Sequence, residues 1–343
     1  MSEGIQPPNP LRSLILTPGD YREQLRAKHP VLKDSQLLIT PGITIVLDAV
    51  RDALNGRKSG ICVIGEPDFG KTSLSKVVAQ VMRKEYPGMP VYRLTAKRHD
   101  GFNEKMQWTD VARAMGLTLA HTAQLIMQDI VTEIRVSALA NEDAIALIII
   151  DEGQTWWTAQ WKYMKGLCNE LADPEAESEH DPVRLVPLTL GQPEISSVVA
   201  SINSLHNHGR DLLKRFFTPT IELKGIRTVE DLQSLLQQYD DPKFTNYPAG
   251  SDVCYTEFWL PLAFAGGWRL VKTGALFWAA LKSDSTTGFS STLGFPLDRV
   301  FLSLKRFLIN ASKLDSADFS STPEMWEASV TGRKQGGPAA PAR

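Results

Sequence analysis

The order of apolar and polar positions predicts a chain in which buried strands alternate with helices over residues 40–225. Short, mostly apolar runs are typical of strands covered on both faces of a sheet, and they occur at 59–64, 91–95, 144–150 and 185–190. Longer stretches with apolar residues three and four positions apart predict helices, as at 72–84, 110–115, 120–139 and 155–171. This alternation favours an α/β fold in which helices flank a parallel sheet.

The pattern changes on either side of this region. A further helix is predicted from Thr40-Pro41 to Asn55-Gly56, with one apolar face formed by Ile45, Leu47, Val50 and Leu54. Beyond residue 226 the apolar stretches lengthen into helical periods and no β–α alternation is evident. We therefore expect a flexible leader or N-terminal extension at 1–39, an α/β core at 40–225, a small helical domain at 226–330 and a disordered tail at 331–343. The first 20 residues are Pro-rich and polar, and docking of this leader on the body or on a partner is an open alternative.

Composition and charge narrow the function classes. The chain has 343 residues, with 37 Lys and Arg against 39 Asp and Glu, so its formal net charge is -2. This length suits two domains, and the hydrophobic fraction of 43% excludes a wholly disordered chain. A near-neutral balance also argues against a protein that coats nucleic acid by bulk charge, so any such contact must come from a local patch.

The cysteines and the N-terminal residues indicate a cytoplasmic protein. Cys62, Cys168 and Cys254 lie far apart, which fits reduced thiols better than a disulfide framework or a zinc site. The first residues lack the layout of a signal peptide, and the apolar run at 144–150 is too short to cross a bilayer. We expect a soluble chain with no membrane partner.

The segment 65–73 carries the strongest motif. Gly65, Gly70, Lys71 and Thr72 satisfy the pattern G-x-x-x-x-G-K-[ST], and the motif stands between a predicted strand and a predicted helix. The backbone of such a loop wraps the phosphates, the lysine reaches the β- and γ-phosphates, and the threonine hydroxyl binds Mg²⁺. The sequence thus predicts that ATP and Mg²⁺ bind at Gly65, Glu66, Pro67, Asp68, Phe69, Gly70, Lys71, Thr72 and Ser73.

Two carboxylates follow the apolar run at 144–150. A buried strand that ends in Asp151 and Glu152 places both acids at the carboxyl edge of the sheet, where α/β proteins bind ligands. Asp151 is the candidate ligand of Mg²⁺, and Glu152 is the candidate catalytic group that orients the attacking water. The alternative is that both acids only begin the next helix, because acids favour first turns.

With both motifs in place, the chain resembles AAA+ ATPases over roughly residues 40–285. The DEGQ at 151–154 and the later LGQPEI resemble the transposition-regulator branch (TnsC, TniB and MuB) and the related ExeA-type ATPases. The resemblance implies a P-loop AAA+ core with a helical lid domain and a homo-oligomer, either a hexameric ring or a helical filament. It also implies that the ATP-loaded form assembles on double-stranded DNA and activates a transposase, with a target-selector protein as a further partner, and that hydrolysis disassembles it.

The resemblance assigns three further residues to the nucleotide site. Gln192 corresponds to the sensor 1 position, and Thr189 is the alternative residue for this role. The segment can also be an ordinary Gly-Gln-Pro turn without a role at the nucleotide. Arg215 corresponds to the arginine finger that acts in a neighbouring subunit's site; Arg210 and a plain surface role are the alternatives. Arg269 in GGWRLVKTG corresponds to sensor 2, which contacts the nucleotide from the lid.

Three cations are the candidates for DNA contact. Lys97, Arg98 and Lys105 follow the second predicted strand, in the region from which similar proteins contact DNA, and their positive charge suits phosphate oxygens. An exposed polar loop without a ligand is the alternative. Trp157 and Trp161 are four positions apart and are expected to share a buried helical face, with a platform for base stacking as the alternative.

The resemblance leaves other functions open. A replication-type DNA ATPase, such as a helicase loader or origin binder, is the main alternative to a transposition regulator. A secretion motor and a signalling switch, both without a DNA role, are further ones.

Overall fold

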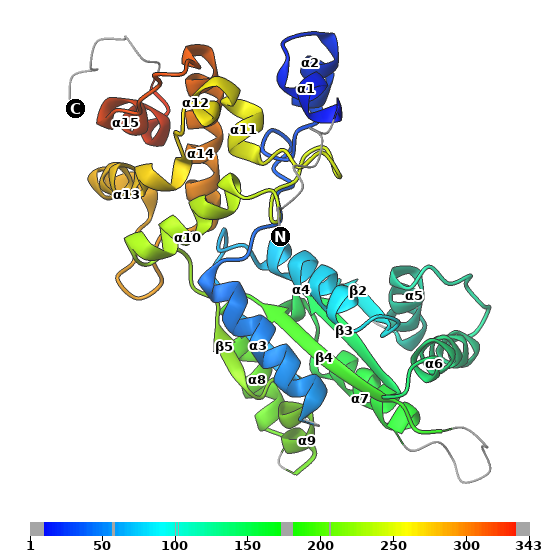
Figure 1. Cartoon of the computed structure of the whole chain (residues 1–343). Coiled ribbons are helices and arrows are strands. Elements are labelled where there is room, and N and C mark those ends of the chain that lie inside the picture. Colours follow the sequence, from blue (N-terminus) through cyan, green and yellow to red (C-terminus); the bar gives the residue numbers. More distant parts are fainter. Residues whose placement is uncertain are drawn as a thin grey trace. The chain divides into compact units, whose positions relative to one another are not determined.

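The computed structural model describes residues 10–56, 59–99, 101, 103–172, 181–205 and 207–333. The described residues form two units, an α/β unit at Gly42–Leu223 and a helical unit that combines Lys224–Arg343 with Met1–Pro41 (Figure 1). The boundary between the core and the C-terminal helices thus falls between Leu223 and Lys224.

The α/β unit is built on a parallel sheet that, within the described residues, has five strands in the order β2-β3-β4-β1-β5 (Figure 1). The strands are β1 (Ile61–Ile64), β2 (Val91–Thr95), β3 (Ile145–Asp151), β4 (Arg184–Gly191) and β5 (Thr220–Glu222). The two central strands β3 and β4 are buried almost throughout, as their continuous apolar runs predict. The α/β fold with a parallel sheet is confirmed.

Helices cover both faces of this sheet. One apolar cluster joins one face to the helices α5 (Glu104–Ala114), α6 (Ala123–Leu139), α7 (Thr158–Ala172), α8 (Ile195–Asn203) and α9 (Asn207–Phe216). Helix α4 (Lys71–Glu85) packs against β2, β3 and β4, and its buried side chains do not belong to that cluster. Helix α4 therefore covers the opposite face, with its N-terminus directly after the phosphate loop.

The helix α3 (Pro41–Asn55) forms as predicted, but its buried face is different. Ile45 was expected in the apolar face and is 58% exposed. Ile43 and Val46 are buried in its place, together with the predicted Leu47, Val50 and Leu54. The positions 43, 46, 47, 50 and 54 keep the three- and four-residue spacing of one helical stripe, and position 45 lies outside it.

The helical unit consists of α10 (Val229–Asp240), α11 (Tyr255–Trp259), α12 (Pro261–Ala265), α13 (Gly274–Ser283), α14 (Leu297–Ala311) and α15 (Pro323–Thr331). Thr228 begins α10 with a capping box, in which its side chain bonds the Asp231 backbone and Asp231 returns the bond. The apolar stretch at 257–265 belongs to two helices that are separated at Leu260, because Pro261 has no N–H to continue the preceding helix and starts a new one instead. Stacked rings hold α15 in place, since Trp326 lies 3.8 Å from Phe307 and 4.1 Å from Phe277 between ring centroids.

Residues 10–39 form an N-terminal extension that docks on the helical unit, and they are not a flexible leader. The helices α1 (Pro10–Leu16) and α2 (Asp20–Lys28) form there, and Ile15, Val31 and Leu38 are buried in the core of the helical unit. Arg12 also bonds Glu257 at 2.6 Å. These residues fold because they cover apolar surface of the C-terminal helices, which local polarity and proline content do not reveal.

The remaining expectations concern the tail, the thiols and the membrane. Helix α15 ends at Thr331 with Gly332 in the left-handed region at φ 74°, so the predicted tail at 331–343 begins inside a helix and its residues from 334 onward lie outside the described residues. The three cysteines are buried and free. Across the described part of the chain, we find no helix with the length and apolar character needed to span a bilayer.

A buried histidine joins the N-terminal segment to the helical unit. His29 is fully buried among the rings of Tyr247, Tyr255, Phe258 and Trp259. Its Nδ1 accepts bonds from the Val31 backbone N–H at 3.1 Å and from the Trp259 indole N–H at 3.4 Å. Burial lowers the pKa of His29 to about 3, because the charged ring has no water around it.

This burial predicts an acid-sensitive helical unit. The unfolded chain takes up a proton at His29 near pH 6.5, whereas the folded chain does so only near pH 3, so stability falls as pH drops through this window. The substitution His29→Asn keeps an acceptor near the Nδ1 position and removes the titration. Urea unfolding between pH 6.5 and 4.5 should show a pH slope smaller by about 1.4 kcal/mol per pH unit than in the parent protein.

The exposed His121 provides the control, since His121→Asn should leave the slope unchanged. Parallel curves for the parent protein and His29→Asn would show that His29 does not drive acid unfolding.

Candidate nucleotide site and cationic loop

The phosphate loop connects β1 to α4 in a conformation that depends on glycine. Gly70 has φ 87°, in the left-handed region, and immediately precedes the first helical residue, Lys71. The backbone N–H of Gly65 donates to the carbonyl of Gly191 at 3.0 Å, which fixes the start of the loop against the end of β4. The first N–H groups of α4 have no acceptor within the helix and face the loop, an arrangement suited to an anion.

Lys71 is held inside this loop. Its Nζ donates to the carbonyls of Gly65 at 2.7 Å and Glu66 at 2.8 Å, and the side chain is buried. Burial lowers the pKa of Lys71, and the charges of Glu152 and Asp151 oppose that change. The ammonium group is therefore short of hydration and ready to exchange two carbonyl oxygens for phosphate oxygens.

Asp151 fits the predicted role at a magnesium ion. It is the last residue of β3 and only 7% exposed, and it accepts the backbone N–H of Glu152 at 3.0 Å. Burial raises the pKa of Asp151, because the carboxylate is largely removed from water. In proteins that bind nucleotides, Mg²⁺ typically takes one or two oxygens from the protein and the others from phosphates and waters. Asp151 and the exposed hydroxyl of Thr72 would supply those oxygens.

Glu152 does not start the next helix, since α7 begins only at Thr158. It has φ 60° and precedes the short 3-10 helix η1 (Gly153–Thr155). Its Oε2 accepts the amide of Gln154 at 2.6 Å and the amide of Gln192 at 3.4 Å. The structure thus brings Gln192 to Glu152, and it adds Gln154, a residue of the DEGQ motif for which the sequence analysis predicts no role.

The alternative sensor residue Thr189 points elsewhere. Its side chain is fully buried in β4, and a Cβ added at Gly153 would come within 2.9 Å of its methyl group. Its hydroxyl has no hydrogen-bond partner among the described residues. Of the two candidates, only Gln192 contacts Glu152.

Arg215 lies at the amino ends of the strands, whereas the phosphate loop lies at their carboxyl ends. It stands in the last turn of α9, and its carbonyl approaches Gly60, the residue before β1, so closely that a side chain at Gly60 would collide with it. The strand β1 separates this edge from Gly65 by about 13 Å at 3.3 Å per residue. Burial raises the pKa of the Cys168 thiol and the nearby Arg215 guanidinium opposes this change, whereas Arg210 is exposed. Arg215 is therefore far from the Lys71 of its own subunit, and the role of either arginine as a finger stays a prediction.

Arg269 is bonded within the helical unit. One guanidinium nitrogen donates to the carbonyls of Phe264 and Trp268, each at 2.7 Å, and the group lies 3.6 Å over the Phe264 ring. Lys272 is exposed and donates to the carbonyl of Gly267 at 3.3 Å. The sensor 2 role of Arg269 stays a prediction.

The loop after β2, residues 96–99, here called the cationic loop, carries two of the predicted DNA contacts. Lys97 is exposed and 3.8 Å from Asp110, whose other oxygen lies 2.6 Å from His99. Arg98 is exposed and stands over the ring of Trp157 at 5.6 Å. Lys105 is exposed on the first turn of the following helix α5.

The expectation for the tryptophans needs a correction. Trp157 is 48% exposed, while Trp156 and Trp161 are buried and pack edge to face. Helix α7 begins at Thr158, so Trp157 precedes it and does not share a helical face with Trp161. The exposed indole instead extends the surface of the cationic loop.

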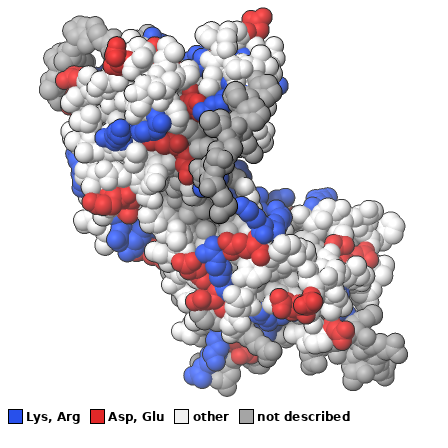
Figure 2. All heavy atoms as spheres, in the orientation of Figure 1, with Lys and Arg blue, Asp and Glu red and all other residues white. Residues whose placement is uncertain are grey.

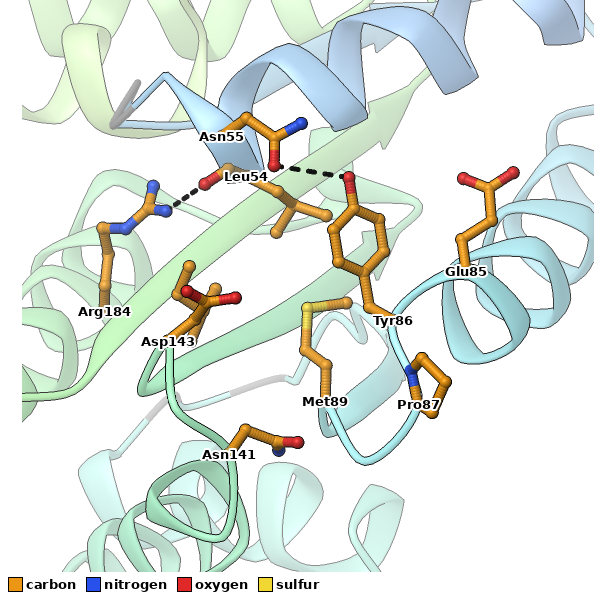
Figure 3. Close-up of a pocket in the computed structure, with 10 residues that line it drawn as sticks. Leu54, Asn55, Glu85, Tyr86, Pro87, Met89, Asn141, Asp143 and Arg184 are labelled. Atoms are coloured by element: carbon orange, nitrogen blue, oxygen red, sulfur yellow. Dashed lines mark hydrogen bonds between the residues drawn. The ribbon is translucent and has the colours of Figure 1, made fainter.

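Other surface features do not belong to this site. Figure 2 shows basic and acidic side chains interspersed over the visible face, in keeping with the near-neutral charge. A cavity of about 560 Å³ lies where β3 and β4 begin, with Asn55, Tyr86, Asn141 and Arg184 in its lining (Figure 3). Within it the Arg184 guanidinium bonds the Leu54 carbonyl. Asp151 ends β3 at the other edge, so this cavity is separate from the nucleotide site.

The parallel sheet, the phosphate loop after β1 and the paired carboxylates after β3 form an α/β fold with a P-loop, and a helical domain follows it in the chain. The chain is similar to the ORC2 protein of Aeropyrum pernix in its ADPNP–ADP complexes, with a TM-score of 0.52 and 13% identity over 88% of this chain and 71% of that one. The ADP form of the same protein gives a TM-score of 0.48 and 15% identity over 84% and 67%. No protein-family model and no curated protein matches the sequence. At this identity the first likeness shows a shared fold, and the finer resemblance to transposition regulators stays a prediction.

The geometry of the loop predicts the effect of removing the Lys71 ammonium. Lys71→Ala should weaken ATP binding by roughly 10- to 100-fold, because charge-assisted bonds to phosphate oxygens contribute about 1.5–3 kcal/mol. Titration with a fluorescent ATP analogue and Mg²⁺ measures the affinity.

Lys76 on the same helix α4 is exposed, so Lys76→Ala is the matched control and should bind as the parent protein does. Equal affinities for Lys71→Ala and Lys76→Ala would remove Lys71 from the site.

Proposed function

We propose that the protein is a Mg²⁺-dependent ATPase that assembles on double-stranded DNA when ATP is bound and leaves it after hydrolysis. The observation that carries this proposal is the meeting of Lys71, Asp151, Glu152 and Gln192 at one edge of the sheet. The similar Aeropyrum pernix ORC2 structure contains ADPNP and ADP, which supports a nucleotide as the ligand.

Each residue at this edge has a defined task in the proposal. The N–H groups of 65–73 and the Lys71 ammonium hold the phosphates, while Thr72 and Asp151 hold the metal ion. A bound Mg²⁺ neutralises charge on the β- and γ-phosphates. Glu152 accepts a hydrogen bond from the attacking water and aligns it, and Gln192 stands beside it to contact the γ-phosphate or the same water.

The position of Arg215 makes turnover depend on assembly. This side chain is at the edge of the sheet away from its own phosphate loop, so it stabilises transferred phosphate only in a neighbouring subunit. In the same scheme the helical unit is the lid, and Arg269 leaves its own carbonyls to contact the nucleotide. A homo-oligomer, as a ring or a filament, is therefore the active form.

The cationic loop supplies the contact with DNA. Lys97, Arg98 and Lys105 offer cationic donors for phosphates, and the exposed Trp157 ring beside Arg98 adds apolar contact with sugars. With a net charge of -2, one subunit has few such donors to offer. Repetition of the loop around a duplex in an oligomer gives the affinity that a single copy lacks.

Two observations favour different partners for this DNA-bound state. The DEGQ and GQPE segments favour a transposition regulator that recruits and activates a transposase, alone or through a target selector. The fold shared with ORC2 of Aeropyrum pernix favours a replication-type ATPase equally well. We propose the first function and keep the second as its alternative.

Blocking hydrolysis separates assembly from release. Glu152→Gln keeps the phosphate loop and removes the carboxylate that aligns water, so it should bind ATP and stay assembled on duplex DNA for at least ten times longer than the parent protein. Assembly is measured by size-exclusion chromatography and electron microscopy. The samples contain ATP or ADP, each with and without duplex DNA. A protein that stays monomeric with ATP and duplex DNA at low salt would refute the proposal.

A second variant tests the DNA contact, and the Glu152→Gln assembly tests the partner. The double substitution Lys97→Ala, Arg98→Ala should bind ATP normally and lose DNA binding, whereas Lys28→Ala on α2 is a control that should change neither.

Retention of a transposase on the Glu152→Gln assembly supports transposition, and retention of a replicative helicase in its place supports the alternative.

A further inference from the structure

We propose that Gln154 is a positioning residue for hydrolysis, which orients the Glu152 carboxylate and ties it to the loop that carries Gln192. The inference rests on the proposed ATPase function and deepens it. Neither the phosphate-loop motif nor the paired acids assign this residue a role, and in the described part of the chain its amide bonds Glu152 and Gln192.

The side-chain amide of Gln154 makes hydrogen bonds through both its nitrogen and its oxygen. Its Nε2 donates to Oε2 of Glu152 at 2.6 Å, the shortest contact that this carboxylate makes within the described residues. Its Oε1 accepts the backbone N–H of Gln192 at 3.0 Å. Gln154 therefore connects the residue after β3 to the residue after β4 through one planar group.

Two glycines let the two loops approach closely enough for this bridge. A Cβ at Gly153 would meet the Thr189 methyl group at 2.9 Å, so the chain after Glu152 lies directly against β4. A Cβ at Gly191 would meet Ile195 at 2.6 Å and the Gln154 Oε1 at 3.2 Å. The left-handed backbone of Glu152, with φ 60°, then turns the chain into η1 so that Gln154 follows on the same side.

This bridge decides which oxygen of Glu152 is available to water. The amides of Gln154 and Gln192 both meet Oε2, so Oε1 remains the acceptor for the attacking water. An amide orients a carboxylate without neutralising it, whereas an ammonium group in the same place would suppress its basicity. A carboxylate that rotates freely spends little time in the aligned geometry, and misplacement by about 1 Å can cost 100-fold in rate.

The test replaces the amide and keeps the length of the side chain. Gln154→Met should lower kcat for ATP hydrolysis by about 10- to 100-fold, while KM and the dissociation constant for ATP with Mg²⁺ stay within about threefold. Gln154→Asn is a second variant, whose amide is one methylene too short for the bridge and which should show the same loss. The melting temperature of each variant shows that it is folded.

Gln160 gives a matched control. It is a buried glutamine of α7 whose amide bonds Gln107 at 3.2 Å and the Trp157 backbone at 2.9 Å, without contact to Glu152. Gln160→Met should keep kcat in the absence of DNA within about twofold of the parent value.

A second measurement separates positioning from general damage. In a double-mutant cycle, Gln154→Met should add little loss of kcat once Glu152→Gln is present, because its effect passes through that carboxylate. Parent-like kcat in Gln154→Met or Gln154→Asn would overturn the inference, as would a joint loss of ATP affinity and kcat. An inactive parent protein in the presence of DNA would instead overturn the proposed ATPase function.

Discussion

Parallel pairing of β1, β3 and β4 is the constraint on which the candidate site depends. In a parallel sheet the carboxyl ends of all strands share one edge, and the register pairs Ile64 with Gly191 and Thr95 with Asp151. The phosphate loop, the two carboxylates and the Gln192 loop therefore meet, although they come from distant parts of the sequence. The same geometry sends Arg215, which precedes β5, to the other edge.

Burial gives this edge its chemical character. Burial removes water from the Lys71 ammonium and lowers its pKa, and it removes water from the Asp151 carboxyl and raises its pKa. A ligand of opposite charge can replace the lost hydration of each group. A magnesium nucleotide offers phosphate oxygens to the lysine and a cation to the aspartate. The site is thus arranged before a ligand arrives, and Gln154 extends that arrangement to Glu152.

Local patterns in the sequence predicted the parts of the molecule that depend on local chemistry. The buried strands and the phosphate loop were predictable because continuous apolar runs and a spaced glycine motif specify them. The bridge by Gln154 was not, since it needs two loops brought together by β4. The packing of residues 10–39 on the C-terminal helices was not predictable, because their partners, such as Glu257, are far along the chain. The exposure of Trp157 depended on a helix that starts three residues later than expected.

The central claim is that the nucleotide site hydrolyses ATP only when subunits assemble, and that duplex DNA promotes this assembly. The most direct test is the ATP turnover per subunit, measured over a range of protein concentrations with and without duplex DNA. The account predicts that turnover per subunit rises with concentration and that DNA shifts this rise to lower concentrations, because each site needs a neighbour's arginine. A turnover per subunit that is independent of both concentration and DNA would contradict it.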